Sequence, residues 1–93
     1  MRDQPYTVDL TRPARRAIAE TLPLDVAIGV TDFLAGPLST DPHRVGKELD
    51  APMKGVYSAR VMREYRLLYV IDEARGAVVV RAVLHRRDAY RAR

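Results

Sequence analysis

The chain has 93 residues, 47% of them hydrophobic and 30% charged, which suits a single folded domain over residues 1–93 rather than a disordered chain. It contains no cysteine, which excludes disulfides, thiolate metal sites and cysteine nucleophiles. Its first ten residues lack an apolar signal segment, and no stretch approaches the roughly 18 apolar residues of a membrane span. We therefore expect a cytoplasmic protein that does not enter a membrane.

The net charge of +4 is concentrated in the second half of the chain. Residues 1–46 have five arginines against six acids, whereas residues 47–93 have eleven Lys or Arg against six acids. Fourteen of the sixteen cations are arginine, whose rigid guanidinium binds phosphate through two hydrogen bonds. A GC-rich genome also favours arginine, so the charge indicates an anionic partner without identifying it.

The first half predicts a strand followed by two helices. Residues 6–10 alternate apolar and polar side chains, as a strand does. Thr11 can cap a helix whose first turn tolerates Pro13, and Pro23 ends that helix. One apolar stripe of this first helix contains Ala14, Ile18 and Leu22.

The second predicted helix, residues 24–35, is too apolar to have one wet side, and Gly36-Pro37 should end it. Either the domain covers both of its faces or a partner protein covers one of them. The expected main face contains Leu24, Ala27, Ile28, Thr31, Leu34 and Ala35, and the flank contains Val26, Val30 and Phe33.

After a long polar loop at residues 39–55, the apolar period changes to two. Strands are expected at 56–62, 65–72 and 77–85, the last of them central in the sheet because it is apolar on both faces. The order β-α-α-β-β-β predicts an α+β fold: a twisted, mainly antiparallel four-stranded sheet with two helices packed on one face.

The turn between the first two of these strands decides where two arginines point. A two-residue turn at Arg63-Glu64 sends Arg60 and Arg66 to opposite faces of the sheet, whereas a three-residue turn, Met62 to Glu64, places them directly opposite each other. Facing arginines repel, so the second arrangement is expected only where a ligand's phosphate offsets the repulsion.

Three motifs carry a family resemblance: P-H-R-x-G-K-x-L at residues 42–49, Y-R-x-x-Y at 65–69 and H-R-R-D-x-Y at 85–90. In their order and spacing, over essentially the whole chain, the sequence resembles the RelE/ParE superfamily of type II toxins. The resemblance implies the RelE/ParE-like fold and a cognate antitoxin protein that binds the toxin in a hetero-oligomer. Because the sequence has no metal-ligand cluster and no phosphate-binding Gly-rich loop, we expect no cofactor or metal. It also implies ribosome-dependent cleavage of messenger RNA, in which a ribose 2′-hydroxyl attacks the neighbouring phosphate in the ribosomal A site.

The same resemblance assigns site residues. Arg66 matches a family arginine that contacts the scissile phosphate, Arg87 the second catalytic arginine, and Tyr90 the aromatic residue that contacts the substrate nucleotide. Two family lysines fall on Arg60, which keeps the positive charge, and on Ser58, which does not.

The general base is a separate question, because an arginine essentially never deprotonates. His85 is the candidate with an ordinary pKa near neutrality, although it could instead have a structural role at the end of the last strand; Glu64, in the turn, is a weaker candidate. The remaining basic residues that could bind RNA or the ribosome are Lys47, Lys54, Arg63, Arg86 and Arg91.

Structural alternatives apply to several of these residues. Arg60 and Arg66 could lie on a solvated sheet face or pair with acids of the antitoxin. Asp88 could pair with Arg86 or Arg87 and hold its orientation, and we expect His43 to be merely exposed. Tyr65 and Tyr69 are expected in the core.

At the level of function, the expected RelE-like enzyme has two alternatives. One is a ParE-like inhibitor of DNA gyrase with no chemistry of its own, and the other is a RelE-like toxin whose active site has degenerated. A single fold hosts all three, so only the site can separate them.

Overall fold

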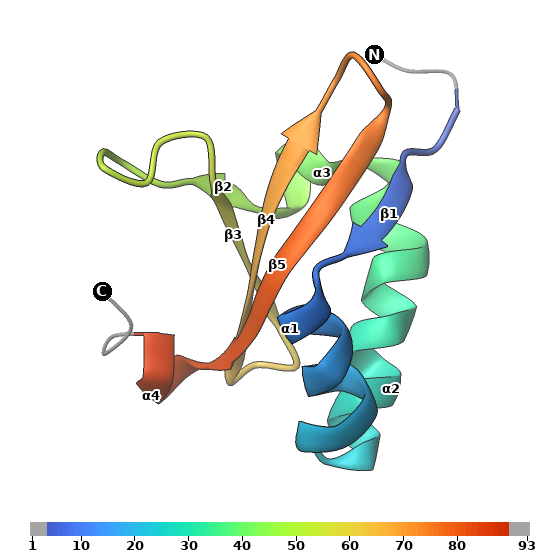
Figure 1. The fold of residues 1–93 in the computed structure, drawn as a ribbon, viewed down its shortest axis with the longest axis vertical. Coiled ribbons are helices and arrows are strands. Elements are labelled where there is room, and N and C mark those ends of the chain that lie inside the picture. Colours follow the sequence, from blue (N-terminus) through green and yellow to red (C-terminus); the bar gives the residue numbers. More distant parts are fainter. Residues whose placement is uncertain (1–3, 90–93) are drawn as a thin grey trace.

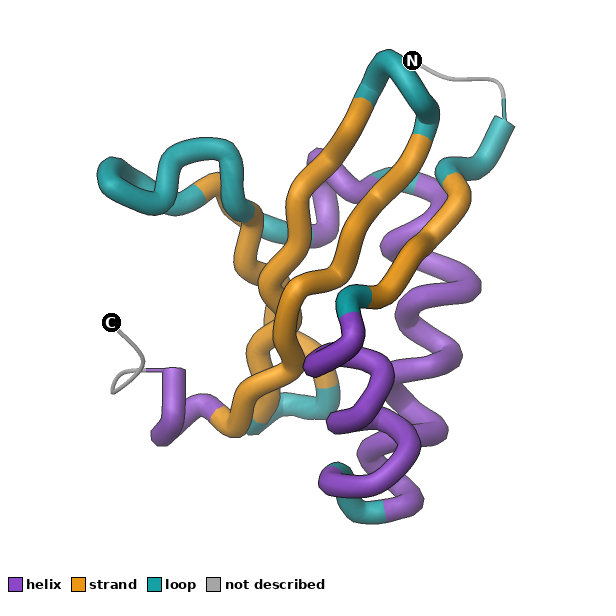
Figure 2. Tube along the Cα trace, viewed as in Figure 1, coloured by secondary structure: helices purple, strands orange, loops and turns teal. Residues whose placement is uncertain are grey.

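The computed structural model describes residues 4–89, which form a five-stranded sheet covered on one face by helices (Figures 1 and 2). The strand order is β1-β5-β4-β3-β2, in which β1 is parallel to β5 and all other neighbours are antiparallel. The strands are β1 (Thr7–Leu10), β2 (Lys47–Glu48), β3 (Tyr57–Val61), β4 (Tyr65–Asp72) and β5 (Ala77–His85). The α+β class, the two covering helices and the central place of β5 are confirmed.

The predicted strand count is wrong by one. Segment 39–55, expected to be a loop, contains a short helix α3 (Pro42–Val45) and the two-residue strand β2, in which Lys47 and Glu48 pair with Ser58 and Tyr57 of β3. Two residues are too few for an alternating pattern to appear in the sequence, so only the pairing with β3 defines this strand.

Each covering helix ends in a wider π-helical turn. Helix α1 (Arg12–Arg16) continues into η1 (Ala17–Thr21), and α2 (Leu24–Phe33) continues into η2 (Leu34–Leu38). The second helix therefore runs past Gly36-Pro37, where the sequence predicted its end. A π turn shifts the hydrogen-bond pattern by one residue, which accommodates a proline that has no N–H to donate. None of the helices within residues 4–89 has the length and hydropathy to cross a membrane.

The core lies between the helices and the sheet. Strands β4 and β5 bury Leu67, Tyr69, Val78 and Val80 completely, and the helices add Ala14, Val30 and Leu38. We call this side of the sheet the helix-packed face. Tyr65 packs against the same cluster, so the prediction that both tyrosines of the Y-R-x-x-Y motif belong to the core is confirmed.

The hydroxyl group of Tyr69 lies inside this core and has a hydrogen-bond partner there. It donates to the carbonyl oxygen of Pro42 in α3 at 2.7 Å. Burial, together with the nearby Tyr57 hydroxyl and the Asp41 carboxylate, raises the pKa of Tyr69 to about 12. This hydrogen bond ties α3 and the following β2 to the centre of the sheet.

Helix α2 leaves part of its apolar surface uncovered. Val26 and Val30 of the predicted flank are buried, and so is Leu34 of the predicted main face. Leu24 and Ile28, also assigned to the main face, are 77% and 54% exposed. Within residues 4–89 the domain therefore does not cover both faces of α2, which contradicts the first of the two alternatives.

Candidate active site

A three-residue turn, Met62 to Glu64, connects β3 to β4, with Val61 paired to Tyr65. Met62 and Arg63 adopt left-handed backbone angles, with φ of 53° and 63°, conformations that cost of order 1 kcal/mol each. The odd turn places Arg60 directly opposite Arg66, the arrangement that the phosphate-binding interpretation requires.

Both arginines point away from the helices. Their strand neighbours Ala59, Val61 and Leu67 are buried on the helix-packed face, and side chains alternate along a strand. The opposite side, which we call the helix-free face, carries Ser58, Arg60, Arg66, Leu68, Ala82 and Leu84.

The charges of these two arginines are not neutralised within the described part of the chain. Arg60 is exposed and Arg66 half-buried, and neither has a carboxylate within 4.0 Å among residues 4–89. Two unneutralised guanidiniums at paired positions repel each other. Such a pair is suited to binding a phosphate, because one anion can accept hydrogen bonds from both.

Strand β2 brings a third cation to the same face. Lys47 lies directly opposite Ser58, which shares its face with Arg60 two residues further along β3. Adjacent strands are about 4.8 Å apart, so Lys47 lies next to Ser58. Ser58 is the position at which the family resemblance implies a lysine. Through strand β2, which the sequence did not predict, Lys47 therefore places a positive charge next to Ser58.

The helix α4 (Arg86–Ala89) follows directly after β5 and carries the next two cations. In Figure 1 it lies on the side of the sheet away from α1 and α2. Arg86 and Arg87 are exposed, and the Arg86 amide donates to the carbonyl oxygen of Glu64 at 2.6 Å. This bond joins α4 to the turn that follows Arg60. Tyr90 and Arg91 lie outside the described residues.

Asp88 forms no ion pair with Arg86 or Arg87 within residues 4–89. The arginine that the resemblance assigns to catalysis is thus not held by its neighbouring acid.

His85 lies on the other face from the two arginines. It pairs with Tyr65, which is opposite Val61 on the helix-packed face, and the two rings meet edge to face at 5.2 Å. Its Nε2 lies 3.2 Å from Oε1 of Glu64, and its Nδ1 accepts a hydrogen bond from the Arg87 amide at 3.2 Å. The structure therefore does not bring His85 together with Arg60 and Arg66.

Of the other basic residues, Lys54 is exposed in the loop after β2 and Arg63 is exposed at the tip of the β3–β4 turn. His43, expected to be merely exposed, has partners: its Nε2 contacts the Glu73 carboxylate and its Nδ1 lies 3.3 Å from the Tyr57 hydroxyl. These contacts tie α3 to β3 and to the β4–β5 turn, and no sequence pattern indicated them.

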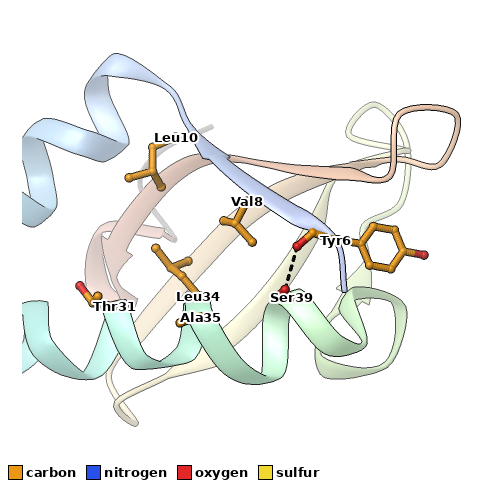
Figure 3. A pocket seen from close by; sticks show the side chains of 7 residues that line it. All are labelled: Tyr6, Val8, Leu10, Thr31, Leu34, Ala35 and Ser39. Carbon is orange, nitrogen blue, oxygen red and sulfur yellow. Dashed lines mark hydrogen bonds between the residues drawn. The ribbon is translucent and has the colours of Figure 1, made fainter. Parts of the chain in front are cut away.

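An apolar pocket of about 310 Å³ lies between β1 and the end of the second helix (Figure 3). The Ser39 hydroxyl donates to the Tyr6 carbonyl oxygen at 2.7 Å beside it. Its lining residues are Tyr6, Val8, Leu10, Thr31, Leu34, Ala35 and Ser39, so it contains none of the candidate cations.

Comparison with known proteins agrees with the sequence motifs. Residues 16–90 match the family model described as ParE toxin of type II toxin-antitoxin system, parDE. The chain is 46% identical over 87 residues to Toxin RelG of Mycobacterium tuberculosis, covering 94% of this chain and 98% of the relative. It is 37% identical over 89 residues to Toxin RelE of the same organism, covering 96% and 90%.

Solved structures show the same fold. The toxin–antitoxin complex RelBE2 from Mycobacterium tuberculosis contains a chain that is 44% identical, with a TM-score of 0.83 and coverage of 91% of this chain and 95% of that one. The isolated Escherichia coli RelE toxin, 21% identical with a TM-score of 0.69 over 86% and 83%, supports the fold alone. The chain belongs to the RelE/ParE superfamily and is a RelE-type toxin of a type II toxin–antitoxin system.

Proposed function

We propose that this toxin is a ribosome-dependent messenger RNA endoribonuclease. In the proposed reaction a ribose 2′-oxygen loses its proton and attacks the adjacent phosphorus. The bond to the 5′-oxygen then breaks, and that oxygen takes up a proton, which leaves a 2′,3′-cyclic phosphate and a 5′-hydroxyl. The observation that carries the proposal is the facing pair Arg60 and Arg66 on the helix-free face, without a carboxylate partner among residues 4–89.

The residue roles follow from charge and position. Arg60 and Arg66 stabilise the negative charge that develops on the phosphate oxygens, and they act by charge alone because guanidiniums do not deprotonate. Lys47 supplies a third positive charge beside Ser58. Arg87 contributes from α4, and Tyr90 contacts the substrate nucleotide, as the family resemblance implies.

The partners are the ribosome with its messenger RNA and an antitoxin, all in the cytoplasm. Exposed cations outside the facing pair would contact ribosomal RNA phosphates, which supply salt-dependent affinity. The apolar edge of α2, Leu24 and Ile28, would be covered by the antitoxin in a hetero-oligomer. The proposed RNA and ribosome contacts are Lys47, Lys54, Arg63, Arg86 and Arg91.

The test is to incubate the purified toxin with a defined messenger RNA and map its 5′ ends with and without programmed ribosomes. We expect new ends only with ribosomes. Arg66→Ala should lower the cleavage rate by about 10²- to 10³-fold, the usual cost of losing one stabilising donor. Arg75→Ala is the matched control, because Arg75 is an exposed arginine in the β4–β5 turn, and it should cleave at the wild-type rate.

The family model is that of a ParE toxin, so inhibition of DNA gyrase is the second candidate. The same preparation is therefore added to a gyrase supercoiling assay. Intact messenger RNA together with blocked supercoiling would replace the endoribonuclease proposal with the gyrase one. Inactivity in both assays would indicate a degenerate toxin.

A further inference from the structure

At the end of the sheet next to α4, His85 contacts three other elements: the β3–β4 turn, α4 and β4. His85, the last residue of β5, contacts the Glu64 carboxylate of the β3–β4 turn through Nε2 and accepts the Arg87 amide of α4 through Nδ1. The ring is held from the side by Tyr65 of β4, edge to face at 5.2 Å. The Arg86 amide makes a second bond to the same turn, at the Glu64 carbonyl oxygen.

These contacts define the state of the ring. Because the Arg87 amide donates to Nδ1, that nitrogen carries no proton, so the neutral ring carries its proton on Nε2. That proton points at Oε1 of Glu64. The charged groups near the ring are the Glu64 carboxylate and, in the adjoining helix, Arg86, Arg87 and Asp88.

We propose that His85 is a positioning residue that orients Arg87, with Glu64 fixing the tautomer. The proposal rests on the proposed function, since it gives meaning to the placement of Arg87. The first N–H groups of an α-helix have no acceptor within the helix, so the start of α4 at Arg86 and Arg87 depends on partners outside it. His85 on the helix-packed face accepts the Arg87 amide, and in the proposed function the Arg87 side chain binds the substrate.

Two substitutions separate the two nitrogens. His85→Asn keeps an acceptor at the Nδ1 position, because the asparagine Oδ1 is as many bonds from the backbone, but it removes the donor to Glu64. His85→Gln keeps a donor near the Nε2 position and removes the acceptor for the Arg87 amide. We expect His85→Asn to cleave messenger RNA within a few-fold of wild type and His85→Gln to lose about 100-fold in kcat at saturating ribosomes, the cost of misplacing a reacting group by about 1 Å.

A spectroscopic readout tests the contact without the reaction. In the ¹⁵N NMR spectrum of the wild-type toxin, the neutral ring of His85 should show an unprotonated Nδ1 and a protonated Nε2. Hydrogen exchange of the Arg87 amide should be slowed in wild type and in His85→Asn, and fast in His85→Gln. Circular dichroism confirms that each variant is folded.

The outcomes are distinguishable from failure of the function. If wild type does not cleave messenger RNA but the Arg87 amide is protected in this pattern, the function is wrong and the anchoring of α4 stands. If His85→Gln cleaves like wild type, or if both variants lose activity equally while folded, the positioning role is wrong. A protonated Nδ1 in the wild-type spectrum would also overturn it.

Discussion

The two faces of the central sheet differ in the burial of their side chains and in whether their charged groups have partners. On the helix-packed face, large side chains such as Leu67 and Tyr69 are completely buried, and every buried side-chain polar atom within residues 4–89 has a partner. On the helix-free face, Arg60 and Arg66 stand opposite each other with no carboxylate of the described chain to neutralise them. On the same strand, Leu67 thus belongs to the core, whereas its neighbour Arg66 belongs to the proposed binding surface.

The largest effect on that comparison should come from Leu67→Ala. Removing a completely buried leucine should lower the free energy of unfolding by about 2–5 kcal/mol. Urea denaturation followed by circular dichroism measures this loss. The matched control is Leu68→Ala, on the helix-free face and only half-buried, which should lose less than half as much. Equal losses at the two positions would mean that both faces contribute alike to stability.

A smaller loss is expected from Tyr69→Phe, which leaves the Pro42 carbonyl without its donor and should cost about 1–3 kcal/mol. The pH dependence gives a second readout. The pKa of Tyr69 is about 12 in the folded protein and about 10 in the unfolded chain, so the unfolded state loses its proton first. This tyrosine's stabilisation is therefore complete below pH 10 and is lost as the pH rises to 12.

Denaturation curves at several alkaline pH values should show a steeper fall for wild type than for Tyr69→Phe. Tyr65→Phe is the control, because no hydrogen bond ties its hydroxyl to the rest of residues 4–89, and it should keep the wild-type slope. A wild-type slope in Tyr69→Phe would show that other groups cause the alkaline loss.

The smallest effect should have the opposite sign. Arg60→Gln removes one of two facing positive charges, so at low salt it should raise the free energy of unfolding by about 0.2–1 kcal/mol. The gain should shrink in 1 M salt, where screening acts within about 3 Å. Arg75→Gln, in the β4–β5 turn, should change stability less. Destabilisation by Arg60→Gln at low salt would mean that the two arginines do not repel.

Much of the fold could be predicted from local pattern. Strands β4 and β5 begin and end at the predicted residues, because alternation and β-branched side chains extend over eight and nine residues. Strand β2 could not be predicted, since a two-residue strand exists only through its pairing with Ser58 and Tyr57. The extension of the second helix past Pro37 depends on a π turn that helix rules do not anticipate.

The site was predictable only in part. The sequence is compatible with a two-residue or a three-residue β3–β4 turn, and phosphate binding by Arg60 and Arg66 requires the three-residue turn. The structure has the three-residue turn. The direction of His85 depends on the register shift between Leu68 and Tyr69, which pairs His85 with Tyr65 on the helix-packed face. No sequence pattern indicates this shift. The charge of Lys47 indicates RNA binding, but its place beside Ser58 depends on strand β2, which the sequence does not predict.

The parallel pairing of β1 with β5 has a consequence for the synthesis of the toxin. Thr7 pairs with Ala77, so β1 is synthesised well before the strand with which it pairs. While residues 77–85 remain in the ribosomal exit tunnel, β1 has no neighbour and β4 lacks one edge. The sheet that carries Arg60 and Arg66 can therefore be completed only after β5 has left the ribosome, because β5 is the strand that joins β1 to β4.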